Sequence, residues 1–369
     1  MVQWSSNETG VDARTDRSET RELIELCGGY FGAYVLTGIL VKYFTAIRSP
    51  KLSQMAYLFD NSVGGSLFAL IIVVFAGWVH LRSNRHVKIG PFTVPSEVKY
   101  IIPSGVCTAV IIPTTTLMYS LPMSVMVAMV IMRGSIIVIS RAVDGVQIRQ
   151  GVLKKRVYAE ENWAVVFALL AVATNILLLP IADKLGIAHS NAKGSFEFIH
   201  SPFALGIMGS YIVAYAIRIY VMNYFKNTRG QGVPLDNKGF FAVEQIAATV
   251  SMIVIVAVVL AIDGNDPRIL DLQHAVHHPD ALAVLSGIPY GAVAFFSVFI
   301  FMFKGRTATF AGLVNRLTSL VAGIAATLLL ALLFGTAWPS IQDWVSVGFI
   351  AVAVWFLSQA ERRRIADRT

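Results

Sequence analysis

Two arginines occupy the middle of long apolar runs. Arg133 lies in VAMVIMRGSIIVI (127–139), and Arg316 lies in AGLVNRLTSLVAG (311–323). At ~1.5 Å of helical rise per residue, Arg133 is roughly 13 Å deep in a span that starts at Ser124. A guanidinium at that depth costs at least ~2.5–3.5 kcal/mol, so it is expected to face a partner or a wet cavity. The planar charged group suits carboxylate or phosphate, which favours an anionic ligand. The alternative is a structural role, in which carbonyls or a carboxylate bind the arginines and lock the helices together.

Other polar and aromatic residues in the spans are candidates for the same site. Tyr34 and Tyr215 fall near mid-depth, where they could stack on a base or sugar or only pack in the core. Asn315 and Thr115 could line a binding site or bond neighbouring helices. Glu244 could carry a coupling proton, or it could be a solvated carboxylate at the edge of its span.

The charged residues of the spans are unevenly distributed in depth. The three acids Glu25, Glu244 and Asp343 lie within five residues of a span end, where they are expected to reach water. Lys42 and Arg218 lie near enough to span ends to snorkel. The deep layer is therefore predicted to hold two arginines without a matching acid.

Composition places the chain in the membrane class. Of its 369 residues, 56% are hydrophobic and only 14% are charged, and the mean hydropathy is +0.65. Soluble proteins carry roughly 25% charged residues. Windows long enough to cross a bilayer as helices recur throughout, and helices satisfy their own backbone in lipid. The sequence predicts an all-α membrane protein with ten transmembrane helices, at 23–45, 62–81, 100–119, 124–140, 162–182, 203–225, 240–262, 281–303, 307–332 and 339–358.

The basic residues predict the orientation. With an inside amino terminus, the inside segments carry 21 Lys and Arg and the outside loops carry 5. This asymmetry predicts that both termini are cytoplasmic, in the cell (inner) membrane if the protein is bacterial. The polar tail 1–22 lacks the apolar core of a signal peptide. The basic groups RQGVLKKR (149–156) and ERRR (361–364) are expected to face the headgroups of the lipid bilayer, and we expect no nucleic-acid partner.

The chain resembles itself at a nearly constant offset. FGAYVLTGILVKYF (31–44) aligns with IVAYAIRIYVMNYF (212–225) at 181, and Arg133 aligns with Arg316 at 183. The offset recurs for Trp163 with Trp344. The segments 23–183 and 203–358 are therefore predicted to be two five-helix repeats, followed by a basic tail at 359–369. Because five is odd, the second repeat is inverted, which is typical of secondary transporters with a site between the repeats.

This layout resembles the drug/metabolite transporter superfamily. TTTLMYSLPMSVMVAMVIMRGSIIVIS (114–140) is similar to the third and fourth spans of its nucleotide-sugar-transporter-like branch, where a Met-Tyr helix end leads through a Ser/Thr turn to a Leu/Met-Arg-Gly core. The last span and its basic tail also look like the closing helix of that superfamily. Some relatives carry glutamine three residues before this arginine, where this chain has Val130. The resemblance implies solute transport and leaves the solute open.

The sequence is compatible with several functions. The leading hypothesis is a secondary transporter of a small polar anion, such as a nucleotide sugar; the second is an exporter of neutral or cationic solutes with structural arginines. A membrane enzyme acting on lipid-linked substrates would need an acidic or histidine cluster that the loops do not supply, and no catalytic motif or cofactor site is evident. The loop DLQHAVHHPD (271–280) could hold a metal, although a solvated loop is favoured. Gly28 with Gly32, and Gly287 with Gly291, are expected to allow close helix contacts. The oligomeric state is open, a homodimer included.

Overall fold

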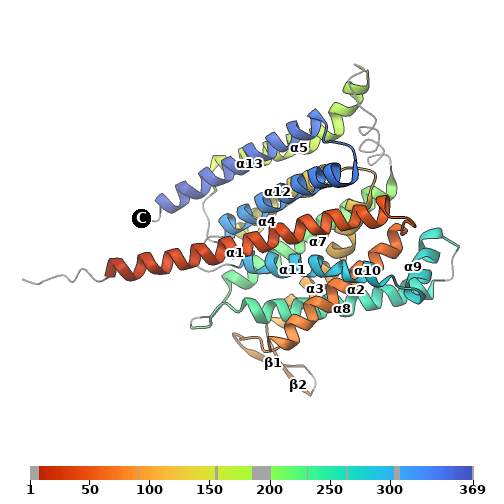
Figure 1. Cartoon of the computed structure of the whole chain (residues 1–369). Helices are drawn as coiled ribbons and strands as arrows, with labels where there is room; N and C mark the ends of the chain where they lie inside the picture. The colour runs from red at the N-terminus through yellow and green to blue at the C-terminus, as the bar shows by residue number, and fades with distance from the viewer. Residues whose placement is uncertain are drawn as a thin grey trace, which may run out of the picture.

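The chain folds into a bundle of long, roughly parallel helices with a short strand pair at one end (Figure 1). A computed structural model describes residues 8–89, 91–153, 157–184, 201–230, 232–262, 265–302 and 308–367. Among these residues, nine helices are long and apolar enough to cross a membrane. The protein is therefore a predominantly helical, multi-pass integral membrane protein.

The first half contains five long helices. They are α1 (Glu8–Lys42), continued by the π-helical turn η1 (Tyr43–Ile47), α2 (Gln54–Phe75), α3 (Val98–Ser120), α4 (Val125–Arg149) and α5 (Ala159–Lys184). Serine side chains cap two of them: Ser53 accepts a hydrogen bond from the Ala56 N–H, and Ser124 accepts one from the Val127 N–H. These caps fix where α2 and α4 begin.

The second half contains the remaining helices. They are α7 (Pro202–Asn227), α8 (Asn237–Ala261), α9 (Pro267–His277), α10 (Ala281–Leu285), α11 (Gly287–Phe301), α12 (Ala308–Phe334) and α13 (Ile341–Ala366). Each of the ten predicted spans overlaps one long helix. The fifth predicted span falls in α5, whose side chains beyond Thr174 lie outside the described residues. The nine membrane-spanning helices found among the described residues therefore do not include α5.

Two predicted boundaries are wrong because polar residues continue a helix. The second span was expected at 62–81, but α2 starts at Gln54 and includes Asp60 and Asn61, which are buried rather than flanking. The fourth span was expected to end at 140, whereas α4 continues to Arg149 and includes Asp144. Tertiary contacts therefore stabilise polar helical turns that the hydropathy pattern treats as loops.

The predicted all-α class agrees with the described residues, which are mostly helical, and the segment between α2 and α3 adds one short non-helical element. There β1 (His86–Ile89) and β2 (Phe92–Pro95) pair in an antiparallel hairpin, with His86 opposite Pro95. Both predicted tails are also largely helical, because α1 begins at Glu8 and α13 runs to Ala366. The segment 271–280 forms the end of α9 and the cap of α10, and the described residues hold no group of three metal-ligating side chains.

The helices pack in layers around a central core (Figure 1). α5 packs on α13 at one side, with α4 and α12 next to them. α1 packs on α11 and α12, α7 packs on α3 and α4, and the pairs α2–α11 and α3–α8 form the other side. The core between these layers is built from α1, α3, α4, α7, α11 and α12.

Glycines bring one pair of helices into backbone contact. A Cβ at Gly287 would lie 2.2 Å from the Asn61 carbonyl oxygen, and one at Gly291 would lie 2.5 Å from that of Gly65. The predicted close contact through these two glycines is confirmed. A Cβ at Gly28 or Gly32 would meet no atom within 4 Å, so the predicted close helix contact at that pair is wrong.

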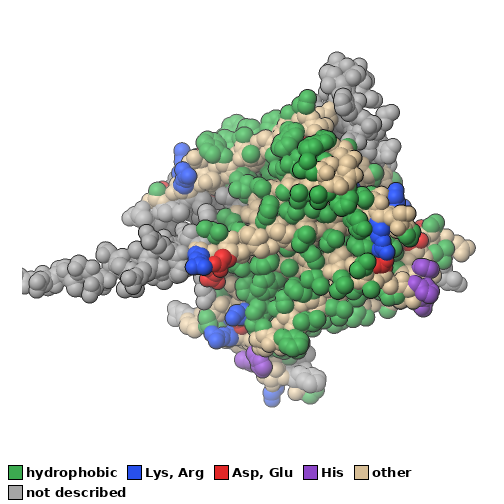
Figure 2. All heavy atoms as spheres, in the orientation of Figure 1, with side chains coloured by type: hydrophobic (Ala, Val, Ile, Leu, Met, Phe, Trp, Pro, Cys, Tyr) green, Lys and Arg blue, Asp and Glu red, His purple; other side chains and the backbone are tan. Residues whose placement is uncertain are grey.

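The surface agrees with a lipid environment. Figure 2 shows hydrophobic side chains over the flanks of the bundle, while charged and histidine side chains gather toward its ends. Large exposed apolar residues lie on the outer helices, for example Ile253 and Val254 on α8 and Trp355 on α13. In water such a surface would be unfavourable, and hydrocarbon removes that cost.

Candidate functional site

Arg133 lies in the core of the bundle on α4. Its side chain is almost completely buried. One terminal nitrogen, Nη2, donates a hydrogen bond of 2.5 Å to the Tyr34 hydroxyl, and the guanidinium lies 5.1 Å from the centre of the same ring. Its Nε–H has no hydrogen-bond partner in the described part of the chain. The arginine is therefore held against an aromatic face and keeps one free donor.

Two tyrosine pairs, one on α1 and one on α7, surround this arginine. Tyr30 and Tyr34 contact edge to face with ring centres 4.8 Å apart, and Tyr211 and Tyr215 lie 5.0 Å apart. Each pair has the i, i+4 spacing that places two side chains on one helix face. All four tyrosines are buried, and all four interact electrostatically with Arg133.

The sequence predicted only half of this aromatic cluster. Tyr34 and Tyr215 were expected near the centre, and both are there. Tyr30 and Tyr211 were missed, although they match at the same offset of 181, one residue before the aligned stretch. Extending the self-alignment by one residue would have found them.

Asn315 and Arg316 approach the same cluster from α12. The Tyr30 hydroxyl donates a 3.0 Å hydrogen bond to Asn315 Oδ1. Arg316 donates from Nη2 to the Ser140 hydroxyl on α4, and its charge interacts with those of Arg133 and Asp144. Asn315 is thus connected to Arg133 through the hydrogen bond with Tyr30 and the ring contact of Tyr30 with Tyr34, which binds the arginine.

The expectation that no acid approaches the deep arginines needs correction. Asp144 was assigned to a loop, but it belongs to α4 and follows Ser140 by one helical turn. This position brings its carboxylate within electrostatic range of Arg316. Arg316 therefore has a counter-charge, whereas the contacts described for Arg133 are with tyrosine hydroxyls and rings.

Thr115, which was predicted as a possible lining residue of the site, lies on α3 between two other threonines, Thr114 and Thr116. The Thr115 hydroxyl donates 2.7 Å to the Ile111 carbonyl on its own helix and neighbours the Tyr290 hydroxyl of α11. Thr114 and Thr116 also donate to carbonyls one turn back. Their donors are used locally, so these residues can offer a ligand only their acceptor lone pairs.

Glu244 lies in a buried ion pair instead of in water. Arg218 on α7 donates two hydrogen bonds of 2.9 Å, one to each carboxylate oxygen, and Ser104 on α3 donates a third of 2.6 Å. The side chains of Arg218 and Glu244 are 5% and 0% exposed. The expectation that both reach water at span ends is wrong, because α3 covers the pair.

The central cluster holds three unpaired donors. Within the described residues, Arg133 Nε, Arg316 Nε and Asn315 Nδ2 are buried and have no hydrogen-bond partner. All three are donors, and two carry positive charge. A buried donor without a partner is costly, so the cluster favours a ligand that presents acceptors and negative charge. The tyrosine rings beside them offer flat apolar faces for the rest of such a ligand.

A cavity of 220 Å³ opens at one end of the same helices. Lys42 of α1 lines it, with Ser124 at the start of α4 and Thr327 on α12. Lys42 was expected to snorkel to water; instead its Nζ donates 2.6 Å to the Leu121 carbonyl. The cavity lies about two helical turns along α1 from Tyr34, since 3.6 residues make one turn.

Comparisons with known proteins identify no family. No family model and no curated protein matches the chain. One crystal structure of a protein is similar at 17% identity, covering 92% of this chain and 99% of that chain, with a TM-score of 0.45. A similarity at this level carries no argument about function, so the interpretation of the site depends on its own residues.

Proposed function

We propose that the protein is a secondary transporter that moves a small organic anion by alternating access between two inverted five-helix repeats. The unpaired, partly cationic donors at Arg133, Arg316 and Asn315 carry this proposal. They are buried between helices of both halves, where a transporter of this architecture binds its substrate.

The helix packing supports the repeat. If α1, α2, α3, α4 and α5 are exchanged with α7, α8, α11, α12 and α13, the largest helix–helix contacts map onto one another. The pair α1–α12 becomes α7–α4, α1–α11 becomes α7–α3, and α2–α11 becomes α8–α3. The pairs α4–α12 and α5–α13 map onto themselves. Two copies of one unit related by a two-fold axis have this property.

The resemblance to the drug/metabolite transporter superfamily adds to the proposal. Its layout implies that both termini are cytoplasmic and that the substrate is a metabolite such as a nucleotide sugar. The cluster's chemistry agrees with such a solute: arginines for carboxylate or phosphate, and tyrosine rings for a base or sugar. In this proposal Glu244, held by Arg218, is the carboxylate available for ion coupling.

A second candidate function is export of a neutral or cationic solute with both arginines structural. It is supported by the contacts of Arg316 with Ser140 and Asp144, which could lock α12 to α4. Binding measurements separate the two candidates. In the anion transporter, Arg133 and Arg316 contribute to ligand affinity; in the exporter, they contribute only to stability.

The test is ligand-induced thermal stabilisation of the purified protein with carboxylates, inorganic phosphate, sugar phosphates and nucleoside diphosphates. A charge-assisted hydrogen bond is worth about 1.5–3 kcal/mol, so Arg133→Ala or Arg316→Ala should weaken binding roughly 10–100-fold. Arg133→Lys keeps the charge and should lose less than Arg133→Ala. Arg82→Gln, at an exposed site, is the control and should respond like the wild type. Wild-type responses from both alanine variants would exclude the anion proposal.

A further inference from the structure

Two ion pairs join loops of opposite halves, one at each end of the bundle. At one end, Arg229 after α7 binds Glu97, the residue before α3, at 2.9 Å. At the other end, Arg48 after η1 binds Asp280, the N-cap of α10, at 2.7 Å. Each pair therefore connects the loop after the first helix of one half to the third predicted span of the other half.

The two pairs are related by the same offset as the repeat. Arg48 aligns with Arg229 at 181, and Glu97 aligns with Asp280 at 183. Each arginine also lies over a phenylalanine of the preceding helix: Arg48 is 5.2 Å from the Phe44 ring, and Arg229 is 4.6 Å from the Phe225 ring. These phenylalanines are aligned with each other in the repeat as well. The same arrangement thus occurs twice, at opposite ends of the bundle.

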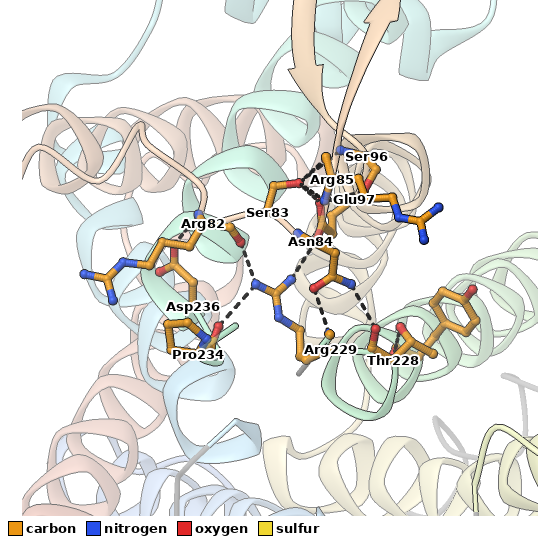
Figure 3. Close-up of polar contacts among 12 residues, drawn as sticks. Arg82, Ser83, Asn84, Arg85, Ser96, Glu97, Thr228, Arg229, Pro234 and Asp236 are labelled. Atoms are coloured by element: carbon orange, nitrogen blue, oxygen red, sulfur yellow. Dashed lines mark hydrogen bonds and ion pairs between the residues drawn. The ribbon is translucent and has the colours of Figure 1, made fainter. Parts of the chain in front are cut away.

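The Arg229 pair is part of a dense network (Figure 3). Arg229 Nη2 also donates to the carbonyls of Arg82, at 2.5 Å, and Pro234, at 3.2 Å. Asn84 joins the same two loops, since its amide donates 2.9 Å to the Thr228 carbonyl. The guanidinium therefore closes the loop after α2 onto the loop after α7.

Glu97 is held ionised within this network. Burial alone would raise its pKa, but hydrogen bonds from the Asn84 N–H and from the Ser83 and Ser96 hydroxyls lower the pKa of this carboxyl below its usual value. The side chains of Arg229 and Glu97 are only 8% and 1% exposed.

The Arg48 pair is more open to solvent. Its side chains are 23% and 20% exposed. Asp280 also accepts hydrogen bonds from the Leu282 and Ala283 N–H groups, and its own N–H donates to Asp60. Exposed ion pairs contribute little to stability, because water competes for both charges. The cavity of 220 Å³ lies at this end and is lined by Ile47, next to Arg48.

We propose that Arg229–Glu97 and Arg48–Asp280 are opposing latches, which close the two ends of the central cluster in turn. This inference rests on the proposed transport function. Both latches are formed in the described conformation. Because the Arg229 latch is supported by more hydrogen bonds than the Arg48 latch, the Arg48 latch opens first.

The test measures access to each end without any solute. In a background with Cys27→Ser and Cys107→Ala, a single cysteine replaces Leu330, which lines the cavity at the Arg48 end, or Val143, near the other end of α4. The labelling rate with a maleimide is compared in the purified full chain with and without Glu97→Gln or Asp280→Asn. Arg82→Gln is the control, because Figure 3 shows its side chain pointing away from Glu97.

The proposal predicts reciprocal changes. Glu97→Gln should raise labelling at position 143 and lower it at position 330, each by roughly tenfold, within the 5–150-fold range usual for coupled sites. Asp280→Asn should do the opposite. If Glu97→Gln does not fold, Arg229→Lys, which keeps the charge, should give a smaller shift in the same direction.

The outcomes separate the latches from the transport function. Labelling that stays constant at both positions, or rises at both, overturns the latch proposal, because simple loop anchors would give either result. If labelling shifts reciprocally but no anion stabilises the protein, the latches stand and the proposed anion transport fails. If anions stabilise the protein and labelling stays constant, the latches fail alone.

Discussion

Neutralising Glu244 tests how much the buried ion pair contributes to stability. Glu244→Gln would place an amide NH₂ against the Arg218 guanidinium, where two hydrogen bonds of 2.9 Å are now made. The pair is 5% and 0% exposed, so water can replace little of the lost interaction. Removing one partner of a buried pair costs about 3–5 kcal/mol, because the other charge stays buried and unpaired.

The expected loss is large enough to measure by thermal unfolding. The entropy of unfolding grows with chain length, at ~2.1 cal/mol/K per residue, so for a chain of 369 residues 1 kcal/mol shifts the unfolding temperature by roughly 1.3 °C, and the expected decrease is about 4–7 °C. The apparent unfolding temperature should be compared in one detergent at one scan rate, since membrane proteins often unfold irreversibly. Ser104→Ala is the matched control: it removes one hydrogen bond and should cost about 1 kcal/mol.

A double variant separates charge pairing from packing. Arg218→Leu combined with Glu244→Gln removes both charges, and neutral replacement of a buried pair is often nearly neutral in stability. It should therefore recover at least half of the loss. A Glu244→Gln protein as stable as the wild type would refute the reasoning, and so would a double variant no more stable than the single one.

Two further predictions concern helix contact and pH. Gly287→Ala should lower the unfolding temperature by several degrees, because its Cβ would lie 2.2 Å from a carbonyl oxygen and overpacking costs about 1–3 kcal/mol; Gly28→Ala, with open space, should be neutral or stabilising, and equal losses would contradict this. The lowered pKa of Glu97 means that its stabilising contribution is present above the usual value of 4.5 and is lost as pH falls through the lowered one. The difference in unfolding temperature between the wild type and Glu97→Gln should therefore be constant from about pH 5 to 8 and shrink only in stronger acid; a difference that disappears near neutral pH would show that this carboxyl is not held ionised.

The sequence predicted the helices well because bilayer thickness fixes the length of an apolar run. It was less accurate where polar residues continue a helix inside the bundle, as at Asp60 and Asp144. Hydropathy scores a residue by type, whereas these carboxylates are stabilised by particular neighbours. The hairpin at 86–95 was missed for a related reason, since its short strands alternate too briefly to stand out.

The burial of several candidate residues was predicted, and their side-chain pairings were missed. Arg133, Tyr34 and Asn315 were identified because depth and repetition can be read along one chain. The pairing of Arg218 with Glu244 joins α7 to α8, and that of Glu97 with Arg229 joins two loops that are distant in the sequence. Such pairs depend on the rotation of each helix about its axis and on loop paths. Hydropathy and spacing carry little information about either.

Aligned positions of the two halves make different side-chain contacts, and this difference could make the two access states of the proposed transporter unequal in energy. Ser104 and Ser286 are aligned in the repeat, and each hydrogen-bonds a polar residue of a neighbouring helix. Ser104 binds the charged pair of Glu244 and Arg218, whereas Ser286 binds the neutral Asn61. Two identical halves would give two access states of equal energy, and a ligand can shift a population only through differential affinity. A charged cluster in one half and a neutral one in the other removes that degeneracy. In the proposed transporter, the Glu244–Arg218 pair would be the group that makes the two access states unequal in energy.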